Sequence, residues 1–312
     1  MFTQEIQTFN QQIELPLLKA KKVELWIKRE DKIHEFVSGN KYRKLKYNIQ
    51  EAQKEDKDII LTFGGAFSNH IVATAVAGKI SGIQTIGIIR GEELEDKFEQ
   101  VIKENKTLNE AHKNGMRFEF VSRATYKEKN DPSYISSLKE KYGNFYLIPE
   151  GGSNDLAIKG CEEILTDKDK KFKYICTAVG TGGTIAGIIR SKWSDQQILG
   201  FSALKGDFLN DEVVKLVKHN EGWEIISENH FGGYGKYNTD LIRFINDFYR
   251  ETNILLDPIY TGKMMYGILN RVEEGYFEPG SKILAIHTGG LQGIHGFNTK
   301  LRKKNLDLIK LR

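Results

Sequence analysis

The chain has 312 residues, 39% of them hydrophobic and 11% aromatic, which is enough for one large buried core or two ordinary ones. No run of about eighteen apolar residues occurs, and the N-terminal segment lacks the basic start and apolar stretch of a secretory signal. The net charge of +4 is spread along the chain, so composition indicates neither a membrane protein nor a nucleic-acid-binding protein.

The predicted elements alternate between apolar strands and amphipathic helices, with glycine-rich turns between them. This order predicts an α/β fold in which parallel sheets carry helices on both faces. Without a low-complexity tract, an internal repeat or a proline-rich linker, two closely packed lobes are expected. The expected strands are 58–65, 84–91, 117–123, 144–152, 174–183, 198–204 and 282–290, and the expected helices are 69–81, 95–115, 155–168 and 239–252.

The first expected helix begins near Asn40 and contains Lys41. The apolar residues Leu45, Ile49 and Ala52 follow at helical spacing, so Lys41 begins the inward stripe. An inward lysine is costly unless it is paired, neutral or covalently bound, and a Schiff base with an aldehyde cofactor removes that cost. Snorkelling of the side chain is the alternative. The remaining basic residues of the segment are expected on other faces: Arg43, Lys44 and Lys46.

A glycine turn after the strand 58–65 leads into Ser68, Asn69 and His70, which open the next helix. A serine in this place is either an ordinary N-cap or part of a site for a substrate carboxylate. The residues alone favour neither interpretation.

The strand 174–179 runs into a loop of small residues and then directly into a helix, which outlines a phosphate site. The glycines are contiguous and no Gly-Lys-Ser/Thr follows, so neither a nucleoside-triphosphate loop nor a dinucleotide fingerprint fits. A phosphate held without metal or lysine indicates a phosphorylated cofactor. The loop residues are Gly180, Thr181, Gly182, Gly183 and Thr184.

Five blocks carry a resemblance to a known family: "SGNKYRKLKY", "GGAFSNH", "VGTGGT", "LDPIYTGKMMYGI" and "HTGGLQG". In this order, between residues 38 and 293, they resemble the D-cysteine desulfhydrase and 1-aminocyclopropane-1-carboxylate deaminase family. These are pyridoxal 5'-phosphate enzymes with the two-domain tryptophan synthase β-like fold, also called fold type II. The resemblance therefore implies parallel sheets flanked by helices and a cofactor in the cleft between the domains.

The resemblance also implies roles for individual residues. Lys41 would bind the cofactor as a Schiff base and remove the Cα proton, and Gly180 to Thr184 would hold the cofactor phosphate. Asn69 would bind the ring hydroxyl, and Ser68 with His70 would bind the substrate carboxylate. The remaining expected site residues are Tyr260 stacked on the ring, Tyr234 on the substrate side, Thr261 near the pyridine nitrogen, and Thr288, which would also bind the cofactor. No metal site is implied.

Thr261 follows the ring-stacking tyrosine, where deaminases that open the cyclopropane ring carry glutamate in this family. A threonine hydroxyl makes the ring a weaker electron sink than a carboxylate does, which suits β-elimination from a substrate with a good leaving group. D-cysteine, yielding pyruvate, ammonia and sulfide, is therefore the expected substrate. The alternatives are 1-aminocyclopropane-1-carboxylate deamination and, in another class, a non-catalytic protein that binds a phosphorylated ligand.

The expected small domain, residues 46–153, is inserted into a large cofactor-binding domain of residues 1–45 and 154–312. A small amino acid is the expected ligand, without nucleic acid or membrane, and the resemblance implies a homodimer. The two cysteines, Cys161 and Cys176, do not have the spacing of metal ligands, so we expect them to be packing residues. Such sparse cysteine usage is typical of a protein in a reducing cytoplasm. Ser38 stands where related sequences commonly have glycine, a departure that bears on the substrate.

Overall fold

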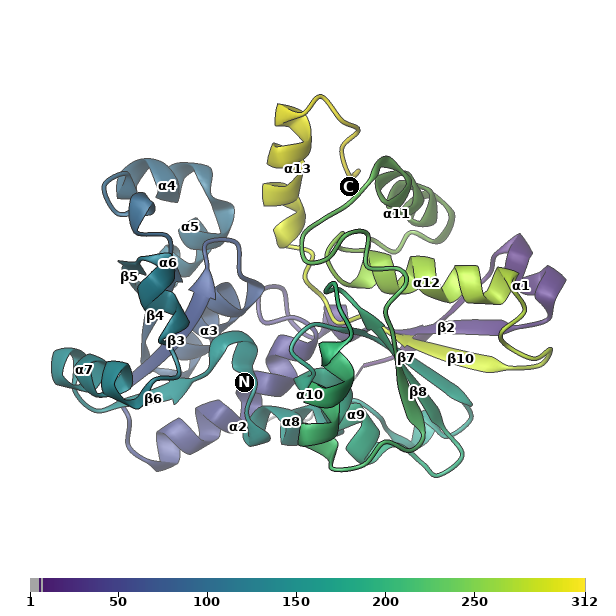
Figure 1. Ribbon diagram of the computed structural model, residues 1–312, viewed down its shortest axis with the longest axis horizontal. Helices are drawn as coiled ribbons and strands as arrows, with labels where there is room; N and C mark the ends of the chain where they lie inside the picture. The colour runs from purple at the N-terminus through teal and green to yellow at the C-terminus, as the bar shows by residue number, and fades with distance from the viewer. Residues whose placement is uncertain (1–5, 7, 312) are drawn as a thin grey trace.

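The computed structural model describes residue 6 and residues 8–311 and contains two β-sheets flanked by helices (Figure 1). The larger sheet has six strands in the order β1-β2-β10-β7-β8-β9. β1 pairs with β2 in antiparallel fashion, and all other pairs are parallel. Its strands are β1 (Asn10–Ile13), β2 (Glu24–Lys28), β7 (Tyr174–Val179), β8 (Gln197–Ser202), β9 (Trp223–Ile226) and β10 (Lys282–Ile286).

The smaller sheet is wholly parallel and has the order β5-β4-β3-β6. Together with its helices it forms the left-hand lobe in Figure 1. All seven strands expected from the sequence are present. The smaller sheet consists of β3 (Ile59–Gly65), β4 (Gln84–Arg90), β5 (Arg117–Val121) and β6 (Phe145–Ile148).

Helices cover both faces of the two sheets, as the alternating pattern predicts. In the larger lobe, α11 and α12 pack on one face and α8 to α10 on the other, giving two separate apolar cores. The α-helices are α1 (Pro16–Lys21), α2 (Asn40–Lys54), α3 (Asn69–Ser81), α4 (Phe98–Glu104), α5 (Lys106–Lys113), α6 (Arg123–Lys127), α7 (Pro132–Tyr142), α8 (Asp155–Glu162), α9 (Gly183–Ser191), α10 (Phe208–Val217), α11 (Thr239–Thr252), α12 (Thr261–Glu273) and α13 (Gly293–Lys303).

The structure departs from the expected elements in several places, and the helix expected over 155–168 already ends at Glu162. The helix expected over 95–115 is broken at Asn105, which has extended backbone angles and whose side chain accepts hydrogen bonds from the amides of Thr107 and Leu108. Asn105 thus caps a new helix, α5, and ends α4. The strands β1, β2 and β9 were not expected, because they are short and carry polar residues, which are amides in β1 and include Glu24 in β2 and Glu224 in β9.

α2 joins the two lobes, since it packs against α3 of the smaller lobe and α8 of the larger one. The approach to α8 is so close that a Cβ on Gly160 would lie 1.9 Å from the Arg43 carbonyl oxygen. The boundary expected between residues 45 and 46 falls inside this continuous helix, and the division into domains stays a prediction.

Because α2 is covered on several sides, the expectation for its other basic residues needs correction. Arg43 and Lys44 are 3% and 2% exposed and do not lie on a solvated face. The Arg43 guanidinium donates to both oxygens of the buried Glu30 carboxylate, at 2.8 and 2.9 Å. Lys46 is half-buried and donates to Glu163 at 2.7 Å.

The cysteines are free and buried. Among the residues that the structure describes, no helix combines the length and apolarity needed to cross a membrane.

Candidate active site

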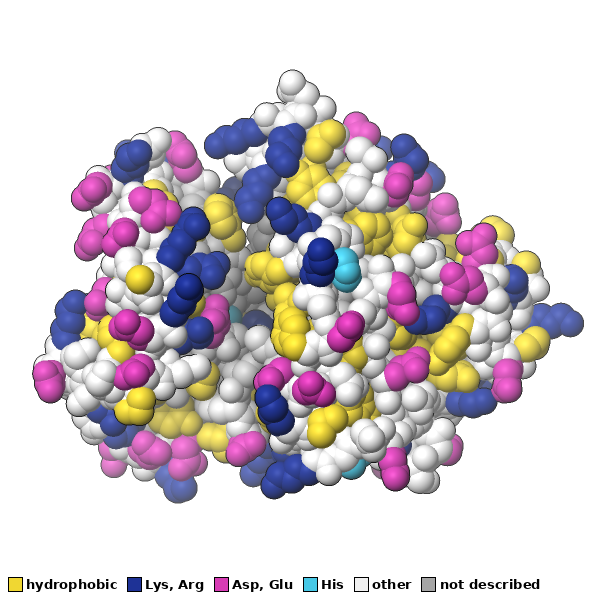
Figure 2. All heavy atoms as spheres, viewed as in Figure 1, with side chains coloured by type: hydrophobic (Ala, Val, Ile, Leu, Met, Phe, Trp, Pro, Cys, Tyr) yellow, Lys and Arg dark blue, Asp and Glu magenta, His cyan; other side chains and the backbone are white. Residues whose placement is uncertain are grey.

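A cavity of about 1170 Å³ lies between the lobes, at the carboxyl ends of the parallel strands of both sheets. Figure 2 shows the corresponding hollow, with basic side chains gathered along its edges. Most of the residues predicted for the site line this cavity: Lys41, Ser68, Asn69, His70, Gly180, Thr181, Gly182, Thr184, Tyr234, Tyr260 and Thr288. Gly183 and Thr261 do not line it. The structure therefore brings together residues that are up to 247 positions apart, from Lys41 to Thr288.

Lys41 lies in the first turn of α2, directly after a tight turn at Gly39. Gly39 has a φ of 58°, and a Cβ there would lie 2.0 Å from the Thr288 carbonyl oxygen, so glycine is required. The Asn40 amide donates to the same oxygen at 3.3 Å. The start of α2 is thereby fixed against the end of β10, and Lys41 is placed at the cavity.

The Lys41 amine is set up to react near neutral pH. Burial, and secondly the charge of Lys44, lower the pKa of Lys41 from 10.5 to about 7. Its Nζ forms no hydrogen bond or ion pair with residue 6 or residues 8–311. A large share of this amine is therefore unprotonated at neutral pH and free to act as a nucleophile or base.

The loop between β7 and α9 forms the expected cradle for an anion. α9 begins at Gly183, and the preceding Gly182 has a φ of 82°, which turns the chain into the helix. The first-turn amides of α9 and the positive end of its dipole point to this end of the cavity. Hydroxyl groups add to it: Thr184 Oγ1 accepts from Asn40 at 2.9 Å, and Thr181 Oγ1 lies 2.6 Å from Ser153 Oγ.

Lys44 also reaches this cradle, which corrects the expectation that the phosphate site contains no lysine. Its Nζ donates to the Gly151 carbonyl oxygen at 3.2 Å and lies 3.3 Å from the position of a Cβ on Gly183. Burial lowers the pKa of Lys44. The spacing of three from Lys41 is compatible with both side chains on one side of a helix, but nothing in the sequence indicates that Gly183 lies beside them.

Ser68 and Asn69 present unused polar groups to the cavity. Ser68 occupies the N-cap position of α3, yet its side chain forms no capping hydrogen bond. The structure thus favours the ligand interpretation of Ser68 over the simple capping one. Asn69 Oδ1 is buried and has no hydrogen-bond partner among the described residues, as expected of a group that meets a donor on a ligand.

His70 does not have the predicted role of a donor to a carboxylate. The Thr62 hydroxyl gives its proton to the Ile148 carbonyl oxygen at 2.7 Å, so it accepts from His70 Nε2 at 2.8 Å. Burial, followed by the charges of Lys41 and Lys44, holds the pKa of His70 well below its ordinary value. The imidazole is therefore neutral and its remaining nitrogen, Nδ1, is an acceptor. Only the backbone amide of His70 is available to a carboxylate.

Two tyrosines from separate segments meet on one side of the cavity. Tyr260 precedes α12, and its ring centroid lies 6.2 Å from that of Tyr234 in a T-shaped arrangement. Burial raises the pKa of both phenols, so both are protonated donors at neutral pH. Lys263 fixes the loop of Tyr234, because its buried Nζ donates to the carbonyl oxygens of His230 and Gly233 at 2.8 and 2.7 Å.

Thr261 does not lie at the cavity, which corrects the expectation that it faces the ring nitrogen. Its hydroxyl and amide both donate to Asp257 Oδ1 at 2.8 Å, and the Asp257 amide donates back to the hydroxyl at 2.9 Å. The Asp257 carboxylate also accepts from the amide of Tyr260 at 3.0 Å and so caps α12. Of the two predicted threonines, Thr288 is the one that lines the cavity.

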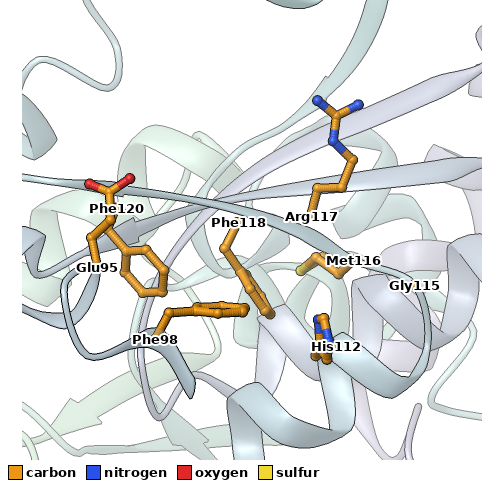
Figure 3. Close-up of a pocket in the computed structure, with 8 residues that line it drawn as sticks. All are labelled: Glu95, Phe98, His112, Gly115, Met116, Arg117, Phe118 and Phe120. Carbon is orange, nitrogen blue, oxygen red and sulfur yellow. The ribbon is translucent and has the colours of Figure 1, made fainter. Parts of the chain in front are cut away.

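A second cavity, of about 460 Å³, lies on the smaller lobe beside the edge strand β5 (Figure 3). The rings of Phe98, Phe118 and Phe120 pack against one another there, with centroids 6.1 to 6.2 Å apart. None of the residues predicted for the site lines it. It is separate from the cleft and carries no part of the proposed chemistry.

The cleft thus contains a lysine whose pKa is lowered to about 7, an anion cradle with a second lysine, and an amide oxygen without a partner among the described residues. Together these groups fit a phosphorylated aldehyde with a ring hydroxyl. The chain belongs to the pyridoxal-phosphate-dependent enzyme family, whose model matches residues 9–289. The expected fold class, cofactor and enzyme class are confirmed.

Relatives with named activities narrow the family. The chain is 32% identical to the mitochondrial bifunctional D-cysteine desulfhydrase/1-aminocyclopropane-1-carboxylate deaminase of Arabidopsis thaliana, over 87% of this chain and 73% of the relative. It is 29% identical to a 1-aminocyclopropane-1-carboxylate deaminase of Rhizobium rhizogenes, over 88% and 89% of the two chains. The crystal structure of a 1-aminocyclopropane-1-carboxylate deaminase homologue has a TM-score of 0.80 and 27% identity, covering 96% and 94%.

Proposed function

We propose that this enzyme deaminates a small amino acid by β-elimination, with D-cysteine converted to pyruvate, ammonia and sulfide. The observation that carries the proposal is the pKa of Lys41, lowered to about 7 by burial and by Lys44, in a cleft that also contains an anion cradle. An amine that is neutral at the working pH serves as a base at Cα. Family membership favours this enzyme over the alternative of a non-catalytic phosphate-binding protein.

The residues of the inner cleft would hold pyridoxal phosphate by complementary groups. Lys44 and the loop from Gly180 to Thr184 would balance and orient the phosphate. Asn69 Oδ1, unpartnered among the described residues, would accept from the ring hydroxyl, and Tyr260 would cover one ring face. The Thr288 hydroxyl would reach the ring nitrogen without charging it. The bound cofactor supplies the carbonyl carbon for Lys41 and an electron sink for the pair left at Cα.

The chain's own groups then position the substrate and move its proton. The Ser68 hydroxyl and the first-turn amides of α3 would bind the substrate carboxylate, which fixes the Cα–H bond relative to Lys41. Lys41 Nζ would take the Cα proton, since Lys44 and burial keep the pKa of Lys41 low. The sulfur leaves Cβ with its electron pair, and water completes the release of pyruvate and ammonia.

Deamination of 1-aminocyclopropane-1-carboxylate is the second candidate, favoured by the names of the relatives. The side-by-side test measures ammonia together with pyruvate from D-cysteine and with 2-oxobutanoate from the cyclopropane substrate. Our proposal predicts a higher kcat/KM for D-cysteine, and the opposite order would replace it with the second candidate. L-cysteine in the same series tests the preference for the D enantiomer.

The assembly and the compartment stay predictions. A homodimer predicts about twice the mass of 35.6 kDa in light scattering of the purified protein. A purified protein that is fully active and has the mass of a single chain would contradict that expectation.

A further inference from the structure

Beyond the inner site, the outer part of the cavity is lined by an excess of basic side chains. They come from both lobes, and Figure 2 shows Lys and Arg gathered along the edges of the hollow. The basic residues of this outer cleft are Arg90, Lys106, Arg123, Lys300, Arg302 and Lys303, against the acidic residues Glu93, Glu104 and Glu150.

Arg90 lies near the segment that would bind substrate. It ends β4, and its Nη2 lies 3.8 Å from the position of a Cβ on Gly65, which starts the turn to Ser68. Its guanidinium lies over the ring of Tyr126, 5.4 Å from the centroid. It is exposed and forms no ion pair with residue 6 or residues 8–311. Arg123, three residues before Tyr126, is likewise exposed and unpaired within that range.

The acidic residues of the outer cleft do not neutralise these arginines. Glu150 is paired with Lys129, at 3.6 Å, so its charge is already balanced. Glu104 accepts from Gln100 at 2.8 Å on α4, and Glu93 is an exposed residue of the short turn after β4. Among the described residues, neither Arg90 nor Arg123 has a carboxylate within 4.0 Å.

Arg90 also faces the substrate side of the opposite lobe. Burial is the main cause that raises the pKa of Tyr234; the charges of Asp257 and Glu150 raise it as well, and the charge of Arg90 lowers it. Arg90 and Tyr234 line the same cavity from the two lobes, so a ligand group between them meets a cation from one lobe and a phenol O–H from the other. Arginine and phenol groups both donate hydrogen bonds to anions.

We propose that Arg90, assisted by Arg123, binds a negatively charged group on the side chain of the substrate, so that the preferred substrates are small amino acids with an anionic β-substituent. This inference rests on the proposed β-elimination. A phosphate monoester is the best match, because its two charges would meet two guanidinium groups. The Cα proton would pass to Lys41 Nζ, and the Cβ–O bond would break with its electron pair going to the departing phosphate. Overall, O-phosphoserine and water would give pyruvate, ammonia and inorganic phosphate.

The test compares an anionic with an uncharged substrate on the holoenzyme. O-phosphoserine and β-chloroalanine, each in both configurations, are assayed for pyruvate with the wild type, Arg90→Gln and Arg123→Gln. Arg117→Gln is the matched control, since Arg117 is exposed on the neighbouring strand and also lies over a tyrosine, 5.9 Å from the Tyr142 ring centroid.

We expect Arg90→Gln to lower kcat/KM for O-phosphoserine by about tenfold or more, mainly through KM, and to leave β-chloroalanine within about twofold. Arg123→Gln should have a smaller effect of the same kind, and Arg117→Gln none. An equal loss on both substrates, or no loss on O-phosphoserine, would overturn the proposal.

A binding measurement separates this inference from the proposed reaction. If the wild type releases pyruvate from neither substrate, the β-elimination fails. Calorimetric titration of the holoenzyme with O-phosphoserine still tests the anion site. Weaker binding by Arg90→Gln than by Arg117→Gln supports the site, and equal affinity rejects it.

Discussion

The inner and outer ends of the cleft are both rich in basic side chains, but they differ in how those side chains are held. At the inner end Lys44 is 2% exposed and lies with Lys41 in one helical turn, so each loses hydration and Lys44 lowers the pKa of Lys41. At the outer end Arg90 and Arg123 are exposed and keep their charge at little cost. The inner end therefore alters the reactivity of the Lys41 amine, whereas the outer end attracts negatively charged ligands. We infer that the first sets the reaction and the second selects the substrate.

The largest effect is expected from removing the inner amine. Lys41→Ala should reduce kcat by about a thousandfold or more, since general-base and covalent catalysis by one group are lost together. Lys46→Ala, on the same helix but paired with Glu163 outside the cleft, should change kcat by less than about threefold. Initial-rate assays with D-cysteine decide this, and comparable losses in the two variants would argue against a special role for Lys41.

The next largest effect concerns the anion cradle. Lys44→Met should weaken binding of pyridoxal phosphate by about tenfold to a hundredfold, because a charge-assisted contact of about 1.5–3 kcal/mol is lost. Spectral titration of the apo protein measures it. Unchanged affinity would mean that Lys44 only fills space beside Gly183.

The same variant sharpens the comparison through pH. The pKa of Lys41 is lowered to about 7 from an ordinary 10.5, so the rate of cofactor uptake by the apo protein should rise with pH through about 7 and then level off. Because the charge of Lys44 lowers this pKa, Lys44→Met should move the midpoint upward. The same pKa shift affects folding. Between about pH 7 and pH 10.5 the unfolded chain binds more protons at Lys41 than the folded chain does, so the destabilising effect of Lys41 on the folded state decreases as the pH rises. A pH-independent uptake rate would contradict the low pKa.

A smaller effect is expected where the two tyrosines are positioned. Lys263→Met leaves the buried carbonyl groups of His230 and Gly233 without their donor, which should cost about 1–3 kcal/mol of stability and raise KM several-fold by loosening the Tyr234 loop. Lys236→Met, an exposed change in the same loop, is the control. Denaturant unfolding and steady-state kinetics together test this prediction. A lower free energy of unfolding with an unchanged KM would show that Lys263 has a structural role only.

The sequence predicted the elements whose patterns are long and regular. α11 begins and ends where its periodicity indicates. α3, which is buried on all sides, is marked instead by the glycine turns before Ser68 and at Gly82, and the central strands such as β7 read as continuous apolar runs because both of their faces are buried. The short strands β1 and β9 were not predicted, because four residues with polar side chains among them, amides in β1 and Glu224 in β9, are too few to show an alternation. Their strand conformation comes from pairing with neighbours.

The site was predictable where the chain folds back on itself locally, as in the cradle from Gly180 to Thr184. Contacts between distant segments were not. The sequence pattern does not indicate that Lys44 lies beside Gly183, since that contact comes from packing α2 near the start of α9. Nor does it indicate that Thr62 of β3 holds the His70 ring of α3. Thr261 was misplaced for a local reason, because its bond to Asp257, four residues earlier, closes a turn that the sequence pattern does not specify.

The central claim is that the Lys41 amine forms the covalent link to the cofactor. Reduction of the coloured holoenzyme with borohydride, followed by peptide mass analysis, tests it directly. The account predicts loss of the visible absorption and a single pyridoxyl group on the peptide containing Lys41. A pyridoxyl group on Lys44 or on any other lysine, with Lys41 unmodified, would contradict it.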